Sequence, residues 1–113
     1  MKIEHYSFGK IVIDGKTYKS DVIIYPEKVD ASWWRKEGHR LQIVDLTDVI
    51  EAKPEVLIVG TGYSGVMAVP RETISHLESK GIKVLVAHTE KAVEMFNRPS
   101  RERRVIAALH LTC

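Results

Sequence analysis

In the second half of the chain, short apolar runs alternate with segments in which apolar residues recur at helical spacing. The runs at residues 56–59, 82–87 and 105–111 are rich in valine, isoleucine and leucine, as expected of strands that are buried on both faces. The segments between them begin near Pro70 and Thr89 and repeat their apolar side chains every three or four positions. This alternation predicts an α/β sheet whose strands are joined by helices.

Local signals set the ends of the two predicted helices. Pro70 suits the first position of a helix that Gly81 ends, and Thr89 is the expected cap of the next helix. Before Pro70, the apolar run at residues 66–69 predicts one more short strand. The run at residues 56–59 is apolar at every position, so we expect it at the centre of the sheet.

The first half of the chain opens with a hairpin pattern. Residues 10–13 form a largely β-branched run, and Asp14-Gly15 is a two-residue turn signal. The second strand is expected over residues 18–25, where Pro26 ends it. We expect this hairpin to pack against the sheet as an extra layer.

Between the hairpin and the sheet, we expect loop structure and one short helix. Residues 46–52 predict the helix, with Thr47 as its cap and Lys53-Pro54 as its stop. Trp33-Trp34 lies in the polar stretch before it. The two rings either fill the gap between hairpin and sheet or cover a pocket, and packing is the interpretation we favour.

Together these elements predict one α/β domain over residues 1–113. We expect three layers, with a mixed central sheet, helices on its faces and an N-terminal β-hairpin. The composition, with 44% hydrophobic and 28% charged residues, is that of an ordinary globular domain.

Charge and cysteine content argue against several classes of function. The formal net charge of +2 gives no basis for binding nucleic acid or a membrane surface. No apolar run approaches the roughly 20 residues that a membrane helix needs, and the first ten residues lack the apolar core of a signal peptide. Cys113 is the only cysteine, so no disulfide can form within the chain. We therefore expect a cytoplasmic protein.

The loop after the first buried run carries the most distinctive motif in the chain. Gly60, Gly62 and Gly65 have the spacing G-x-G-x-x-G of dinucleotide sites. However, the strand-like run at residues 66–69 follows where a helix should hold the pyrophosphate, and the lysine of a P-loop is missing. Three interpretations remain open: a tight turn, a ligand-binding nest of backbone N–H groups, or a dinucleotide site. The nest would be formed by Gly60, Thr61, Gly62, Tyr63 and Ser64.

A group of arginines follows the last predicted helix. It comprises Arg98, Arg101, Arg103 and Arg104. The group either forms a solvated loop or folds back toward the strand ends as a basic pocket for a carboxylate or phosphate. In the second case, Thr89, Arg98 and Arg104 would bind the anion near a helix N-terminus, and His88 or Tyr63 would serve as an acid.

The histidines form no metal motif. His110-x-x-Cys113 supplies two ligands, whereas a zinc site needs three or four. We predict no metal and no cofactor. No catalytic arrangement is readable along the chain, so the catalytic residues stay unknown and a non-enzymatic protein is favoured.

The order of many residues matches that of a known family. These residues are Tyr18-Lys19, Trp34-Arg35, Gly60-Thr61-Gly62, Val69-Pro70, Thr73, Leu77, Gly81-Ile82, Val84, Thr89-Glu90, Ala92-Val93, Asn97, Arg104-Val105 and His110-x-Thr112-Cys113. The chain resembles a widespread family of small α/β proteins of undetermined biochemical function. That family includes the human adipogenesis-associated protein and, more distantly, a mitochondrial complex I assembly factor. The resemblance implies the three-layer fold and no established reaction. It also implies Gly60, Gly62, Asn97 and Arg104 as site or framework positions.

From the residues and the resemblance, we expect a binding or assembly-factor-like protein without enzymatic activity. The alternative is a protein or enzyme that binds a phosphate- or carboxylate-bearing small molecule with the glycine loop and a basic pocket. We expect a monomer or a weak homodimer, with a protein partner or a small anionic ligand, and no nucleic acid or membrane.

Overall fold

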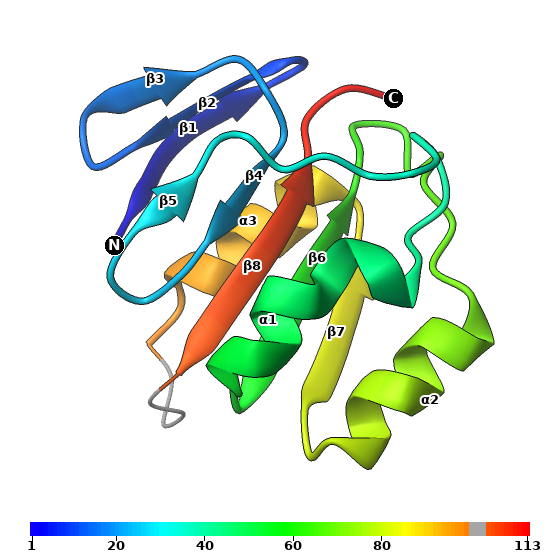
Figure 1. Ribbon diagram of the computed structural model, residues 1–113. Helices are drawn as coiled ribbons and strands as arrows, with labels where there is room; N and C mark the ends of the chain where they lie inside the picture. Colours follow the sequence, from blue (N-terminus) through cyan, green and yellow to red (C-terminus); the bar gives the residue numbers. More distant parts are fainter. Residues whose placement is uncertain (100–103) are drawn as a thin grey trace.

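The computed structural model describes residues 1–99 and 104–113 and contains two β-sheets and three α-helices among them (Figure 1). The small sheet has the order β1-β2-β3, and the large sheet has the order β5-β4-β8-β6-β7. The strands are β1 (Ile3–Ser7), β2 (Lys10–Ile13), β3 (Lys16–Tyr18), β4 (Val22–Ile24), β5 (Val29–Asp30), β6 (Val56–Thr61), β7 (Lys83–Ala87) and β8 (Val105–His110). The helices are α1 (Thr47–Ala52), α2 (Arg71–Ser79) and α3 (Thr89–Asn97).

The large sheet is mixed, as predicted. Strand β6 runs parallel to both β7 and β8, while β4 runs antiparallel to β8 and β5. Every residue of β6 is buried, which confirms the central strand expected at residues 56–59. Strand β7 lies at the sheet edge, where Lys83 and Val86 are exposed, so the prediction of a fully buried strand there is wrong. An edge strand has a neighbour on one side only, which leaves part of it open to solvent.

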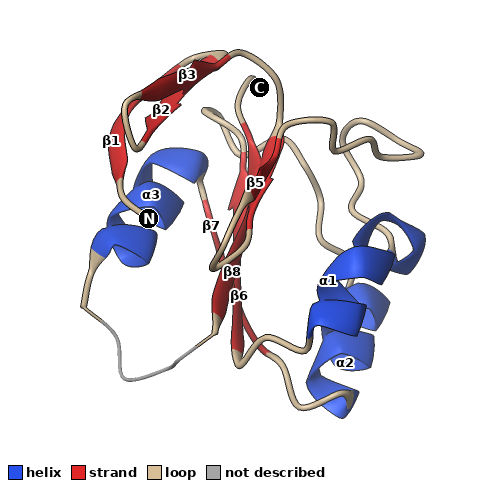
Figure 2. Cartoon of the chain, turned by 60° about the vertical axis from the view of Figure 1, so that its left-hand side comes forward, coloured by secondary structure: helices blue, strands red, loops and turns tan. Residues whose placement is uncertain are grey.

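Helices and the small sheet cover the two faces of the large sheet and complete three layers (Figure 2). Helices α1 and α2 lie on one face, over an apolar cluster that includes Leu57, Val59 and Leu77. Helix α3 and the small sheet lie on the other face, over a cluster that includes Ile11 and Ile58. Successive residues of β6 therefore point into opposite clusters, as the two-residue period of a strand requires. The predicted fold class is confirmed.

The N-terminal hairpin is present, but it differs from the prediction in two ways. Its turn is Asp14-Gly15, with both residues at positive φ (48° and 81°), as a two-residue hairpin turn requires. The expected strand at residues 18–25 is instead divided: β3 ends at Tyr18 in the small sheet, and β4 begins at Val22 in the large sheet. Sequence analysis also missed β1, which pairs with β2.

The strand predicted at residues 66–69 does not form. Only Ala68 makes a bridge there, to Arg40. The N–H of Met67 donates to the Thr61 oxygen (3.1 Å) and that of Ala68 donates to the His39 oxygen (2.8 Å). The apolar run is therefore a connecting segment that is hydrogen-bonded to the end of β6 and to the loop at His39.

Two helix starts also differ from the prediction. A 3₁₀ turn at Ile43–Leu46 runs directly into α1, so Thr47 is already inside the helix and makes no capping bond. Pro70 stands one residue before α2, while Gly81 follows its end at φ 80°, as a helix-ending glycine does. Among the described residues, no helix combines the length and apolar character needed to span a membrane.

Candidate functional site

The glycine loop lies at the carboxyl end of β6, beside residues 111–113 (Figure 1). The N–H of Tyr63 donates to the Thr112 oxygen (2.7 Å). Those of Ser64 and Val66 both donate to the Cys113 oxygen (3.2 and 3.0 Å). The backbone donors that the nest interpretation offers to a ligand are therefore used by the chain itself. Of the three interpretations, these contacts favour the tight turn.

Two glycines make this close contact sterically feasible. Gly62 has φ +110°, and a Cβ atom there would lie 2.7 Å from the carbonyl oxygens of Thr112 and Cys113. Gly65 has φ +72°, and its Cβ would overlap the ring of His88. Both positions thus combine a backbone conformation that favours glycine with the absence of space for a side chain.

Thr89 joins the glycine loop to β8 rather than capping α3. Its Oγ1 donates to the His110 oxygen (2.6 Å) and accepts from the N–H of Gly62 (2.8 Å). The residue before the helix is His88, which makes no side-chain cap, so the capping prediction for Thr89 is wrong. The buried hydroxyl thus bonds main-chain groups of both the glycine loop and β8.

Arg104 lies at the opposite end of the sheet from the glycine loop. Its oxygen accepts from the N–H groups of Glu55 and Val56, at the start of β6, whereas Thr61 ends that strand. A strand of this length separates its ends by about 16 Å. The Arg104 side chain donates to the Ala52 oxygen (3.2 Å) and pairs weakly with Glu27 (3.9 Å). It therefore cannot share a pocket with the glycine loop.

Arg98 and Asn97 also lie away from the glycine loop, at the other end of α3. Arg98 borders a small hollow with Val56 and Lys83, the first residues of β6 and β7. Asn97 binds the main chain of Ile3 through both ends of its amide, at 3.0 and 2.7 Å, and so fastens β1 to α3. Arg98 and Arg104 thus do not form the expected basic pocket with the loop. Arg101 and Arg103 lie outside the described residues.

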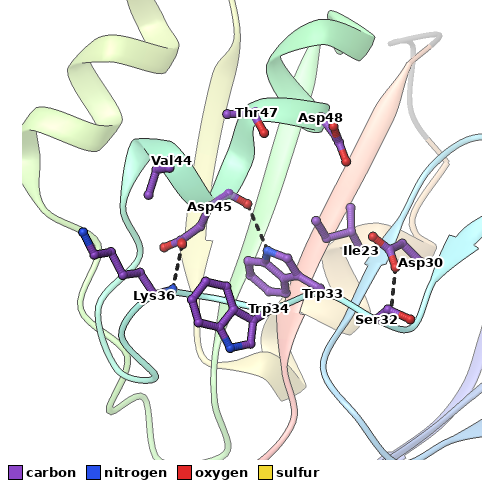
Figure 3. Close-up of a pocket in the computed structure, with 10 residues that line it drawn as sticks. All are labelled: Ile23, Asp30, Ser32, Trp33, Trp34, Lys36, Val44, Asp45, Thr47 and Asp48. Carbon is purple, nitrogen blue, oxygen red and sulfur yellow. Dashed lines mark hydrogen bonds between the residues drawn. The ribbon is translucent and has the colours of Figure 1, made fainter.

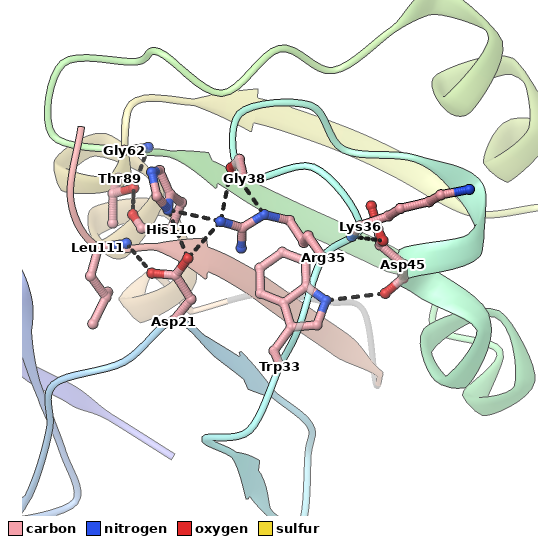
Figure 4. Close-up of polar contacts among 10 residues, drawn as sticks. All are labelled: Asp21, Trp33, Arg35, Lys36, Gly38, Asp45, Gly62, Thr89, His110 and Leu111. Atoms are coloured by element: carbon pink, nitrogen blue, oxygen red, sulfur yellow. Dashed lines mark hydrogen bonds and ion pairs between the residues drawn. The ribbon is translucent and has the colours of Figure 1, made fainter.

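A buried cluster of three charged or titratable residues lies beside the glycine loop (Figure 4). It comprises Asp21, Arg35 and His110, which come from the loop before β4, the segment after β5 and the end of β8. Arg35 Nη2 and His110 Nδ1 each lie 2.7 Å from Asp21 Oδ2. The N–H of Leu111 donates to Asp21 Oδ1 (2.8 Å). Only 6% of each of the Arg35 and His110 side chains is exposed, and 17% of Asp21.

The pKa of Asp21 reports the balance of forces in this cluster. Burial alone raises that pKa, but hydrogen bonds from His110, the Leu111 N–H and Arg35 outweigh it and lower the pKa to about 2. Asp21 is therefore ionised at neutral pH, and its carboxylate accepts the hydrogen bonds of this cluster. The Nε2 atom of His110 is buried and has no hydrogen-bond partner among the described residues.

Arg35 also holds the segment that follows β5. Its Nε and Nη2 donate to the Gly38 oxygen (3.2 and 2.9 Å), and its guanidinium lies 4.7 Å from the centre of the Trp33 ring. Trp33 Nε1 donates to the Asp45 oxygen (3.1 Å), and Asp45 Oδ1 accepts from the N–H of Lys36 (2.9 Å). A polar network thus runs from the sheet to the surface and fixes this segment (Figure 4).

The fixed segment forms one wall of an open cleft of about 420 Å³, which we call the tryptophan cleft (Figure 3). It is lined by Ile23, Asp30, Ser32, Trp33, Trp34, Lys36, Val44, Asp45, Thr47 and Asp48. Trp33 is half-buried and packs on the core, as favoured from the sequence, whereas Trp34 is 76% exposed and Val44 59% exposed. Trp33 therefore contributes to packing, whereas Trp34 forms part of an exposed surface.

Nothing along the sequence indicates that the three residues of the charged cluster meet. Arg35 and His110 are 75 positions apart, and Asp21 is 89 positions from His110. Asp21 and Arg35 have polar neighbours in the sequence that are equally typical of surface residues, and only His110 lies within an apolar run, at residues 105–111. In the described residues, no group of three or more His, Cys, Asp or Glu side chains is arranged to hold a metal ion.

The fold and the site define a small mixed α/β protein with a buried ionic cluster beside an open aromatic cleft. The chain belongs to the family described as proteins of unknown function (DUF498/DUF598), which matches residues 3–110.

Solved structures show the same fold over the whole chain. A conserved hypothetical protein from Pyrococcus horikoshii OT3 is 28% identical, with a TM-score of 0.84 and complete coverage of both chains. The protein MT938 is 26% identical, with a TM-score of 0.80 and coverage of 99% of this chain and 98% of that one. A Bartonella henselae protein described as an outer membrane protein is 24% identical, with a TM-score of 0.77 and coverage of 98% and 94%. This last likeness concerns the fold alone.

Proposed function

We propose that this chain is a cytoplasmic, non-enzymatic binding protein that recognises a partner protein through the tryptophan cleft. The observation that carries the proposal is the exposure of Trp34, at 76%, on a segment that the polar contacts of Arg35 with Gly38 and Asp21 hold in place. Tryptophan dominates the binding energy of many interfaces because it buries a large apolar area and retains a polar N–H. A rigid, exposed tryptophan beside a cleft is ready for such contact.

The cleft offers a continuous binding surface rather than an isolated ring. Val44 lies in the same lining and is 59% exposed. Trp33 lines the cleft too and packs against the core. Because the backbone of this wall is already fixed, a partner would lose little binding energy in ordering it. The reducing compartment that we propose fits a chain whose only cysteine, Cys113, is free.

The contacts elsewhere weigh against the alternative of a small-molecule enzyme. The N–H groups of Tyr63, Ser64 and Val66 already donate to Thr112 and Cys113. The Asp21–His110 pair resembles the base of a catalytic triad, but His110 Nε2 is sealed from solvent and no substrate reaches it in this conformation. Neither feature provides an open reacting centre.

Within the family, we propose that the chain is nearest to the adipogenesis-associated branch, because it carries the sequence His110-Leu111-Thr112-Cys113. We also propose an assembly-factor-like role, in which the chain binds one partner during the building of a larger complex. A monomer or a weak homodimer would leave the tryptophan cleft free for that partner.

The test is to find a partner whose binding needs Trp34. Proteins captured by the wild-type chain are compared with those captured by Trp34→Ser and by Phe8→Ser, a matched control at another exposed aromatic residue outside the cleft. A captured protein is then purified and titrated calorimetrically. We expect Trp34→Ser to weaken binding at least about tenfold and Phe8→Ser to change it less than about twofold. If every captured protein binds Trp34→Ser as tightly as wild type, the proposal is wrong.

A further inference from the structure

We infer that the tryptophan cleft binds the cationic side chain of a lysine or arginine on a partner polypeptide. This inference rests on the proposed function, because it names the chemistry that the same cleft recognises. Indole rings and carboxylates meet in this cleft, and each of these groups attracts cations.

The charge of the lining favours a cation. Three carboxylates, those of Asp30, Asp45 and Asp48, stand against one ammonium group, that of Lys36, which leaves two formal negative charges in excess. The whole chain has a formal charge of +2. The negative excess is therefore a local property of this cleft.

Two of the carboxylates retain free acceptor capacity. Both oxygens of Asp45 accept main-chain N–H groups, from Lys36 and Gln42, at 2.9 Å. Asp30 uses Oδ1 alone, for the N–H of Ser32 (2.8 Å), and Asp48 makes no hydrogen bond or ion pair with any described residue. Figure 3 shows the Asp30 and Asp48 carboxylates entering the cleft from different elements, β5 and α1. These two groups are the acceptors left for a ligand.

One of the two indoles already has a cation over its ring, from a residue outside the cleft lining. The guanidinium of Arg35 lies over the Trp33 ring, at 4.7 Å from its centre. The neighbouring Trp34 ring is mostly exposed, and no described lysine or arginine lies over it. Figure 3 shows the Lys36 side chain extending away from both indoles. The place over Trp34 is therefore open to a cation from outside.

The shape of the cleft favours a long side chain over a small free amine. Its volume of about 420 Å³ exceeds what a bare ammonium group fills, and exposed Val44 extends its apolar wall. Lysine and arginine carry apolar stems that pack on such surfaces while the charged head stays near water and carboxylates. A polypeptide side chain would therefore place its stem against Trp34 and Val44 and its charge near Asp30 and Asp48.

The inference is tested with end-blocked tripeptides and NMR. The probes are Gly-Lys-Gly and Gly-Arg-Gly, with Gly-norleucine-Gly as the neutral isostere of lysine and Gly-Glu-Gly as the charge reversal. We expect the two cationic peptides to shift the indole N–H signal of Trp34 in a saturable way, more weakly as salt screens the carboxylates.

Variants at the exposed carboxylates locate the site. We expect Asp48→Asn to weaken binding of the lysine peptide about threefold and Asp30→Asn with Asp48→Asn about tenfold. Glu94→Gln, at an exposed carboxylate of α3 outside the cleft, should leave binding unchanged. Asp48 is exposed and Asp30 is only half-buried, so the variants are expected to fold, which their thermal unfolding checks.

Three results would overturn the inference: no saturable shift with either cationic peptide, equal binding of the norleucine peptide, or wild-type affinity in the double variant. Failure here is distinguishable from failure of the proposed function. If a purified partner needs Trp34 but binds equally well without the carboxylates of Asp30 and Asp48, the proposed function stands and the inference of a cationic ligand is wrong. If the cationic peptides bind but no partner needs Trp34, the cation site stands and the proposed function is wrong.

Discussion

The glycine loop and the tryptophan cleft differ in whether the rest of the chain already occupies their binding groups. In the loop, the N–H groups of Tyr63, Ser64 and Val66 are all satisfied by residues 112–113 of the same chain. In the cleft, Trp34 is left exposed and Asp48 makes no hydrogen bond or ion pair with a described residue. The region with the more familiar motif is therefore internal framework, and the region without a motif offers open chemistry. A motif indicates a site only if its donors remain free.

The largest expected effect is from Asp21→Asn, which breaks the framework beneath the cleft. Arg35 would lose its carboxylate partner while remaining buried, and an uncompensated buried charge costs about 3–5 kcal/mol. Chemical denaturation at neutral pH measures this loss. The exposed Arg40→Ala, which removes only surface pairs with Glu37 and Glu72, is the control and should cost below about 1 kcal/mol. A loss for Asp21→Asn as small as that of the control would contradict the framework role.

Next in size is the contrast between two glycines at positive φ. Gly62→Ala should destabilise by about 3 kcal/mol, because its Cβ would enter the space of Thr112 and Cys113 as well as adopt a strained backbone. Gly15→Ala has a similar backbone strain but open space around its Cβ, so we expect about 1 kcal/mol. The difference between the two losses in unfolding free energy measures the steric effect of the contact between the glycine loop and residues 112–113. Equal losses would mean that backbone conformation alone requires glycine at both positions.

Acid should weaken the same framework. The pKa of Asp21 is lowered to about 2 in the folded state and is about 3.9 in an unfolded chain. A depressed pKa stabilises the fold above the unfolded value, and this contribution is lost as pH falls through the folded one. We expect about 2 kcal/mol to disappear between about pH 4 and pH 2. Denaturation curves of the wild type and of Asp21→Asn over that pH range give the unfolding free energies, and their difference isolates the contribution of Asp21. Parallel curves for the two proteins would assign the acid sensitivity to other groups.

The smallest expected effect sharpens the comparison from the other side. Trp34→Ser should change the unfolding free energy by less than about 0.5 kcal/mol, because the ring is mostly exposed and supports nothing beneath it. Trp33→Ser should cost several times more, since that ring packs on the core and donates to Asp45. Thermal unfolding of both variants separates them. A large loss at Trp34 would show that the ring has a structural role and is not free for binding.

Patterns within short windows predicted much of the fold. The run at residues 56–59 identified a central strand, and Asp14-Gly15 identified a hairpin turn, because burial on both faces and positive φ each leave a local mark. The run at residues 66–69 misled because an apolar connecting segment and a strand look alike over four residues. Its main-chain hydrogen bonds go to Thr61, at the end of the preceding strand, and to His39 and Cys113, which are both distant in sequence.

The candidate site was much less predictable. The double tryptophan was noticed, but nothing in the sequence separates the half-buried Trp33 from the exposed Trp34. The Asp21–Arg35–His110 cluster depends on contacts that only the folded topology creates. A pocket shared by the glycine loop and the arginines was one of two open alternatives, yet the sheet holds Gly62 and Arg104 at opposite ends of one strand pair. Distance along a strand was the missing information.

The position of β8 in the large sheet bears on how the protein is made. It is the last of the strands in chain order, yet it lies between β4 and β6 and joins them. During synthesis, the two halves of the large sheet therefore have no shared strand until residues 105–110 leave the ribosome. Domains whose pairing is long-range form late and expose apolar surface while they wait. A nascent chain stalled before residue 105 should thus bind chaperones far better than a nascent chain in which residues 105–110 have already left the ribosome.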